Sequence, residues 1–209
     1  MYFLHLFHAG GFMMYPLLLC SIIVVAIFFE RYRYYSSHRS NTERLSAVMT
    51  DSLNRGDIEG LKDALKTDGG IPAGVLLSAV NVYGTKAHQA TIIEGAAAHA
   101  AGLLKNYLNY LDVIVTLSPL MGLLGTVIGM IGSFGVLSTA EGQPFAITGG
   151  VAEALVCTAT GLFVAIIALI AYTYLSQQVS HYISSIEKLS SVYLAICLLY
   201  TSDAADDLT

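Results

Sequence analysis

The chain has 209 residues, of which 55% are hydrophobic and only 12% are charged, and its mean hydropathy is +0.64. A soluble globular domain carries roughly a quarter of charged residues, so this composition excludes an ordinary soluble protein and indicates a membrane protein. The formal net charge of −5 excludes the basic surface that nucleic-acid binding requires.

Three apolar segments are long enough to cross a bilayer, because a helix rises about 1.5 Å per residue and the hydrocarbon core is roughly 30 Å thick. We predict transmembrane helices over residues 12–29, 113–137 and 147–175. Residues 1–11 contain no Lys or Arg, and no A-x-A-like cleavage site follows the first apolar segment. We therefore expect that segment to be a retained anchor rather than a cleaved signal peptide.

The positive charges indicate the orientation of these spans. Nine of the ten Lys and Arg residues lie between residues 31 and 110, and the tenth is Lys188. Basic residues close to span ends stay in the cytoplasm. We therefore predict that residues 1–11 and the loop 138–146 lie outside, whereas residues 30–112 and 176–209 lie in the cytoplasm.

The predicted cytoplasmic segments have helical patterns. Apolar residues recur at helical spacing in two stripes: Leu45, Val48, Met49 and Leu53, and then Ile58, Leu61 and Leu65. Gly56 can end the first of these helices and Asp57 can cap the second, and the segment DGGIP (68–72) breaks the pattern.

Both later spans are expected to continue into the cytoplasm as helices. No proline interrupts the sequence between residue 87 and Pro119, which predicts one continuous helix through the second span. The third span leads into an amphipathic stripe made of Val179, Ile183, Ile186, Leu189 and Tyr193. The fold class is therefore predicted to be all-α, with a helical cytoplasmic domain built on the second and third spans.

The second and third spans each have one face of small residues that includes a threonine. In the second span this face comprises Pro119, Gly122, Thr126, Gly129 and Ser133, with Gly125 and Gly132 in a neighbouring row. In the third span it comprises Ala154, Thr158, Gly161, Ala165 and Ala168. Small residues at this spacing allow helix backbones to approach closely in lipid, so we predict tight packing along these faces.

Thr126 and Thr158 lie at similar depth. Each is about ten residues from the outer end of its span, which places both roughly 15 Å deep, near the bilayer midplane. The two hydroxyls could line a shared polar track. Alternatively, each could bond back to the carbonyl of its own helix four residues earlier, and geometry alone favours this alternative.

Glu153 is a carboxylate about a turn and a half inside the outer end of the third span. An ionisable group within a membrane segment is a candidate functional group, but a carboxylate in the first turn of a helix is also stabilised by the helix dipole, and both interpretations remain open. No span carries a carboxylate at mid-depth. Either the chain moves no protons, or the acid that carries them belongs to another chain.

The segments SPLMGLLGTVIGMIGSF (118–134) and GGVAEALVCTATGLFVAIIALIAYTYL (149–175) resemble the second and third spans of the ExbB/TolQ/MotA proton-channel family, and they are most similar to ExbB. The resemblance covers about residues 12–199. It implies a pentameric ring of three-span subunits in the bacterial inner membrane, with a periplasmic N-terminus and a cytoplasmic C-terminus. The ring would surround an ExbD-like single-span partner, whose membrane aspartate carries the proton.

In this family, Thr126 and Thr158 would face the partner's aspartate, and Glu153 would lie near the outer entrance. The ring would drive a TonB-like protein that energises outer-membrane transport, with the proton as the transported ion and no cofactor. The alternatives are a TolQ-like subunit that serves envelope integrity and, from another class, a non-conducting membrane scaffold. An enzyme is not expected, because the sequence contains no HExxH motif and no Ser/His/Asp set.

Overall fold

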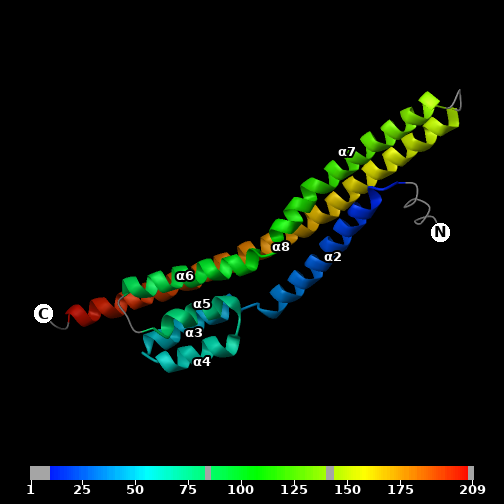
Figure 1. The fold of residues 1–209 in the computed structure, drawn as a ribbon. Helices are drawn as coiled ribbons and strands as arrows, with labels where there is room; N and C mark the ends of the chain where they lie inside the picture. The colour runs from blue at the N-terminus through cyan, green and yellow to red at the C-terminus, as the bar shows by residue number, and fades with distance from the viewer. Residues whose placement is uncertain (1–9, 83–85, 140–143, 207–209) are drawn as a thin grey trace. The chain divides into compact units, whose positions relative to one another are not determined.

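The structure is a computed structural model that describes residues 10–82, 86–139 and 144–206, and helices joined by short turns make up these ranges (Figure 1). The helices are α2 (Met14–Ser37), α3 (Thr42–Asn54), α4 (Ile58–Asp68), α5 (Ile71–Val80), α6 (Lys86–Lys105), α7 (Leu108–Thr139) and α8 (Pro144–Asp206). The all-α prediction is confirmed for the described residues. Among them, three helical stretches, corresponding to α2, α7 and α8, are long and apolar enough to cross a membrane.

The chain forms two compact units. The first consists of Met1–Arg31 and Tyr107–Leu175, and the second of Tyr32–Asn106 and Ser176–Thr209. Both α2 and α8 contribute residues to each unit, because neither helix ends where the units divide. The predicted continuation of the third span as a helix into the C-terminal segment is therefore confirmed up to Asp206.

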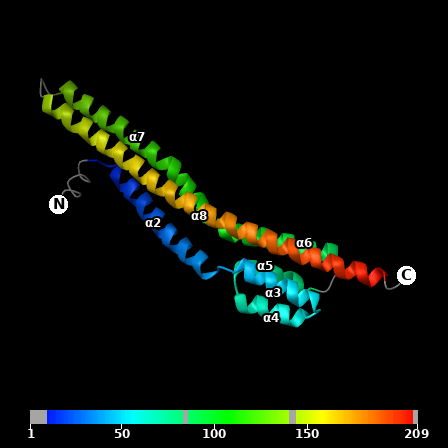
Figure 2. The same ribbon diagram turned by 180° about the vertical axis from the view of Figure 1, so that it is seen from behind.

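The first unit contains most of α2, all of α7 and the first part of α8. Figures 1 and 2 both show α7 and this part of α8 side by side and antiparallel. The buried face of α2 is formed by Met14, Leu17, Cys20 and Val24, which recur at helical spacing. The rings of Phe28 on α2 and Tyr174 on α8 lie 6.1 Å apart. The remaining faces of the three helices carry exposed apolar side chains, as expected where lipid or other membrane helices are the solvent.

The second unit begins with three short helices whose ends follow from local sequence. The Asn41 side chain caps α3 by accepting from the amide of Arg44 at 3.1 Å, and the Asp57 side chain caps α4 by accepting from the amide of Gly60 at 2.8 Å. Gly56, with φ of +72°, follows α3, and Gly69, with φ of +64°, ends α4. The predicted roles of Gly56 and Asp57 are confirmed.

The core of the second unit is an apolar cluster from α3, α4, α5, α6 and the C-terminal part of α8. Its buried members are Leu45, Met49, Leu53, Leu61, Leu65, Ala73, Val75, Leu76, Ala79, Val80, Ile93, Ala100, Ile186, Leu189 and Tyr193. Most residues of the predicted stripes are buried. The exceptions are Val48 and Ile183, which are partly buried, and Ile58, which is 43% exposed because it stands in the first turn of α4. Helix α5 was not predicted, since it is apolar on nearly every side and shows no periodic pattern.

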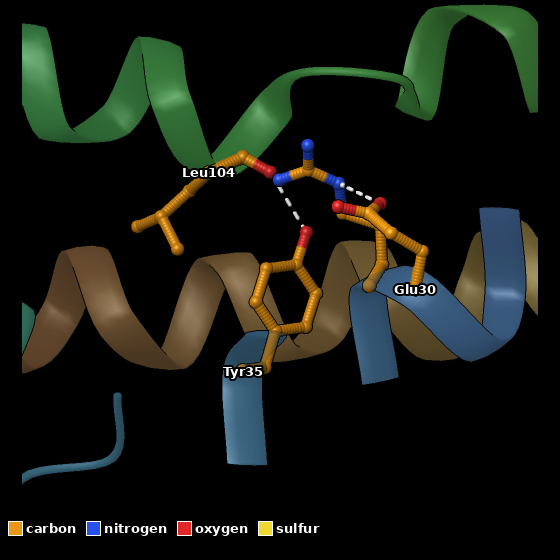
Figure 3. A network of polar contacts seen from close by, with 4 residues as sticks. Glu30, Tyr35 and Leu104 are labelled. Carbon is orange, nitrogen blue, oxygen red and sulfur yellow. Dashed lines mark hydrogen bonds and ion pairs between the residues drawn. The ribbon is translucent and has the colours of Figure 1, made fainter. Parts of the chain in front are cut away.

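Two tyrosines tie helices of the second unit together through buried hydrogen bonds. The hydroxyl of Tyr35, near the end of α2, donates to the carbonyl oxygen of Leu104 on α6 at 2.7 Å (Figure 3). The hydroxyl of Tyr182 on α8 donates in turn to the carbonyl oxygen of Tyr35 at 2.5 Å. Burial raises the pKa of Tyr182, because the phenolate would lose its hydration there.

The predicted continuous helix from residue 87 through the second span is wrong at one point. Helix α6 ends at Lys105 and α7 begins at Leu108, and Tyr107 between them has φ of +66°. A left-handed conformation costs a non-glycine residue roughly 1–2 kcal/mol. The Arg31 guanidinium lies 4.6 Å from the centre of the Tyr107 ring, a cation–π contact that offsets part of this cost. Nε of Arg31 also lies 3.0 Å from Oε2 of Glu30, which is labelled in Figure 3.

Candidate functional site

The contact between α7 and α8 is built on glycines that let the two backbones touch. A Cβ atom placed on Gly161 of α8 would lie 2.6 Å from the carbonyl oxygen of Ser118 and 3.0 Å from Cα of Gly122, both on α7. A Cβ atom on Gly129 would lie 3.1 Å from the carbonyl oxygen of Gly150 on α8. A larger residue at position 161 would therefore force the two backbones apart, whereas at position 129 the neighbouring atoms would have to shift by a few tenths of an ångström.

The other small residues named from the sequence fall on both sides of this contact. Ala154 packs on Gly129, and Ala165 is buried on the same helix. A Cβ atom on Gly125 would overlap the sulfur of Cys157 and would also lie 3.5 Å from Cβ of Met13. Pro119 is partly exposed, and a Cβ atom on Gly132 would meet no atom within 4 Å in the ranges that the structure describes. Most of the predicted small residues therefore lie in the contact between α7 and α8, whereas Gly132 lies outside it.

The two threonines use their hydroxyls differently. The Oγ1 atom of Thr158 donates across the helix pair to the carbonyl oxygen of Gly122 at 3.1 Å. The Oγ1 atom of Thr126 donates to the carbonyl oxygen of Leu123, three residues earlier on its own helix, at 2.6 Å. Thr126 therefore bonds back to its own helix, to the carbonyl three residues earlier rather than the predicted four, and Thr158 does not. In a regular α-helix the amide of residue 126 donates to the carbonyl of residue 122. The carbonyl oxygen of Gly122 therefore links the backbone of Thr126 to the side chain of Thr158.

Further hydroxyls lie along the same contact. Ser118 is completely buried, and its hydroxyl has no hydrogen-bond partner among the described residues. Ser133 donates to the carbonyl oxygen of Gly129 at 2.9 Å and lies against Gly150. Ser133 belongs to a small face that the sequence predicts, whereas nothing in the sequence around Ser118, one residue before Pro119, indicates that this residue is buried.

Glu153 lies near the start of α8 and is partly buried. Its carboxylate is in contact with Gly11, in the segment that precedes α2. Within residues 12–29, 113–137 and 147–175, Glu153 is the sole Asp, Glu, Lys or Arg. In the part of the chain that the structure describes, no cluster of three His, Cys, Asp or Glu side chains could hold a metal ion.

The sequence that forms this helix pair matches a known family of proteins. Residues 71–188 match the family model of the MotA/TolQ/ExbB proton channel family. The chain belongs to this family. A protein of Synechocystis sp. described as a putative biopolymer transport protein ExbB-like 3 is 35% identical to it over 167 residues, which cover 78% of this chain and 79% of the relative.

Membership of the proton channel family, together with the three apolar helices, makes the chain a multi-pass membrane protein. The matched region contains all of α7 and the part of α8 that carries Glu153, Thr158 and Gly161. The resemblance inferred from the two membrane motifs is confirmed. In a proton channel, groups that donate and accept hydrogen bonds within the spans are the natural candidates for contact with the proton carrier.

Proposed function

We propose that the chain is the channel-wall subunit of a proton-driven stator and that the acid carrying the proton belongs to a partner chain. One observation carries this proposal: the spans of this proton channel family member hold a single charged side chain, Glu153, and it lies near one end of α8. A proton that crosses the membrane on a carrier needs an acid near mid-depth, and the middle of each span offers hydroxyls and the thiols of Cys20 and Cys157 but no carboxylate.

The hydroxyls of α7 and α8 suit a guest carboxylate. The Thr126 side chain is partly exposed and bonds only within its own turn, so rotation about χ1 can redirect its hydroxyl toward a carboxylate placed against α7. A hydroxyl both donates and accepts, and it can therefore serve the charged and the protonated forms of an acid. Thr158 holds the two helices together behind that surface through its bond to Gly122.

The partner best suited to this wall is an ExbD-like single-span protein with an aspartate in its membrane helix. In our proposal it stands inside a homo-oligomeric ring, a pentamer, in the bacterial inner membrane, with the N-terminus of each subunit in the periplasm and the C-terminus in the cytoplasm. Movement of the partner then energises a TonB-like protein for outer-membrane transport, which accords with the biopolymer transport role named for the Synechocystis relative. Glu153 stands at the outer entrance.

Reconstitution tests the proposal directly. The chain is placed in proteoliposomes with and without a single-span, aspartate-bearing partner encoded beside it, and a potassium diffusion potential drives protons past an internal pH dye. We expect proton flux only when both chains are present, and none when the partner aspartate is changed to asparagine. Flux through the chain alone, or an unaltered flux with the asparagine variant, would contradict the assignment of the acid to the partner.

A further inference from the structure

The segment Gly10–Gly11, which immediately precedes α2, lies against the start of α8 in the first unit. Gly11 has φ of +66°. Its carbonyl oxygen accepts a hydrogen bond from the amide of Met14, the first residue of α2, at 3.2 Å. A Cβ atom on Gly11 would overlap Oε1 of Glu153 and would lie 2.9 Å from Cδ of the same carboxylate. The backbone of Gly11 and the carboxylate are therefore in direct contact.

We propose that Gly11 is a positioning residue for Glu153: the bare backbone at this point fixes where the carboxylate stands at the outer end of α8. The role of that carboxylate in proton entry rests on the proposed function, whereas the contact itself does not. Two independent features favour glycine at position 11, namely its backbone conformation and the space around it. An L side chain is strained at this φ, and any Cβ atom would occupy the space of the carboxylate.

The contact between Gly11 and the Glu153 carboxylate predicts the effect of a substitution at position 11. The carboxylate is the far end of a flexible side chain, so an added methyl group would displace the carboxylate rather than separate α2 from α8. Gly11→Ala thus moves Glu153 without removing its charge. This distinguishes a positioning role from a purely structural one, because a structural defect would not depend on what residue 153 is.

Gly10 supplies a matched control one residue away. A Cβ atom on Gly10 would lie 2.5 Å from Cγ and 2.7 Å from Sδ of Met14, and 3.4 Å from Cγ1 of Val156. The Met14 thioether is also a flexible end and can move aside, but no atom of Glu153 is among these neighbours. Gly10→Ala therefore tests the effect of a methyl group in the same segment without touching the carboxylate.

The first experiment needs no partner chain. Purified protein in detergent is treated with a hydrophobic carbodiimide, and the modification of Glu153 is followed by mass spectrometry of the peptide that contains it. We expect Gly11→Ala to increase the labelling rate severalfold, because the displaced carboxylate leaves its contact with the backbone. Gly10→Ala should label as the wild type does. An unchanged rate in Gly11→Ala, or an equal increase in both variants, would overturn the proposal; circular dichroism checks that all variants keep their helix content.

The second experiment measures coupling between the two positions in proton flux with the partner present. Glu153→Asp keeps the acid but retracts it by one methylene, away from Gly11. We expect Gly11→Ala to lower flux in the Glu153 background and to cause no further loss in the Glu153→Asp background. Equal losses in both backgrounds would overturn the positioning role. If the wild type shows no flux with the partner, the proposed function fails, and the labelling experiment still decides the contact between Gly11 and Glu153.

Discussion

The hydroxyl of Thr158 on α8 and the carbonyl oxygen of Gly122 on α7 are joined by a hydrogen bond of 3.1 Å across the helix pair. The bond is possible because the backbones approach closely at this level, where a Cβ atom on Gly122 would lie 3.1 Å from Cα of Thr158. Hydrogen bonds between membrane helices contribute about 0.6 kcal/mol on average and about 1.7 kcal/mol at most. The bond is therefore more important for the register of the two helices than for their stability.

Replacement of Thr158 by valine should abolish most of the partner-dependent proton flux while the chain still folds. Valine has nearly the same shape but cannot donate to Gly122, so the register at the midpoint of the pair is no longer fixed. Proteoliposome flux with the partner, and thermal unfolding in detergent, provide the two measurements.

Two variants control this prediction. Thr160→Val removes a hydroxyl that bonds only to Val156 on its own helix, at 2.8 Å, and should leave flux near the wild-type level. Thr158→Ser keeps the donor and should retain most of the flux. Similar losses in Thr158→Val and Thr160→Val would show that the cross-helix bond has no special role.

Replacement of Gly161 by alanine should destabilise the α7–α8 pair by about 1–3 kcal/mol, the usual cost of overpacking. The added methyl group would lie 2.6 Å from the backbone carbonyl of Ser118, which cannot move aside. Gly132→Ala on α7 is the matched control, since its methyl group meets no atom of the described residues within 4 Å. Unfolding of the monomer in detergent compares the two, and equal stability would contradict the close contact.

Two glycines of the second unit should respond to alanine with opposite signs. Gly69 ends α4 with φ of +64°, so Gly69→Ala should lower the free energy of unfolding by roughly 1 kcal/mol. Gly74 lies inside α5 with open space around it, so Gly74→Ala should raise the free energy of unfolding by roughly 0.5–1 kcal/mol. Thermal unfolding measures both, and stabilisation by Gly69→Ala would exclude the left-handed helix end.

Replacement of Tyr182 by phenylalanine should lower the free energy of unfolding by about 1 kcal/mol near neutral pH, because the buried carbonyl of Tyr35 loses its hydrogen-bond donor. The difference in the free energy of unfolding between the wild type and Tyr182→Phe should decrease at alkaline pH. Burial is the largest influence and raises the pKa of Tyr182; Arg39 lowers it and Tyr34 raises it.

The direction of the pH effect follows from proton linkage. Below about pH 10, the ordinary pKa of tyrosine, the folded and unfolded states both hold the proton and the stabilisation is complete. As pH rises from there through the raised folded-state pKa, the unfolded state releases its proton first and the wild type loses stability. Unfolding of the wild type and Tyr182→Phe at pH 8 and pH 11 measures this, and a constant difference would contradict it.

Much of the fold follows from local sequence. The end of α3 at Gly56 and the cap of α4 at Asp57 depend only on neighbouring residues, and they are where the sequence predicts them. The apolar stripes that contain Met49 on α3 and Leu189 on α8 can also be predicted from the sequence, because apolar residues at helical spacing lie on one face of the helix. The unbroken course of α8 agrees with the absence of glycine and proline between residues 162 and 206.

The features that the sequence does not reveal depend on contacts between distant segments. Nothing near Tyr107 predicts a left-handed residue, and the contact that accompanies it comes from Arg31 on α2, which is distant in the sequence. Thr158 bonds to Gly122 rather than to its own helix because the packing of α7 on α8 brings that carbonyl within reach. The contact of Gly11 with Glu153 is likewise tertiary, since 141 intervening residues separate the two positions.

The tight meeting of α7 and α8 also limits where a hydrated route can run. A water molecule is about 2.8 Å across, and the backbones at Gly161 and Ser118 leave too little width for one to pass between the helices. At this level, neither water nor a lipid tail can pass between the two helices. In the channel that we propose, a chain of water molecules would therefore run along the outer surface of this helix pair at that level, and the partner helix would form its other wall.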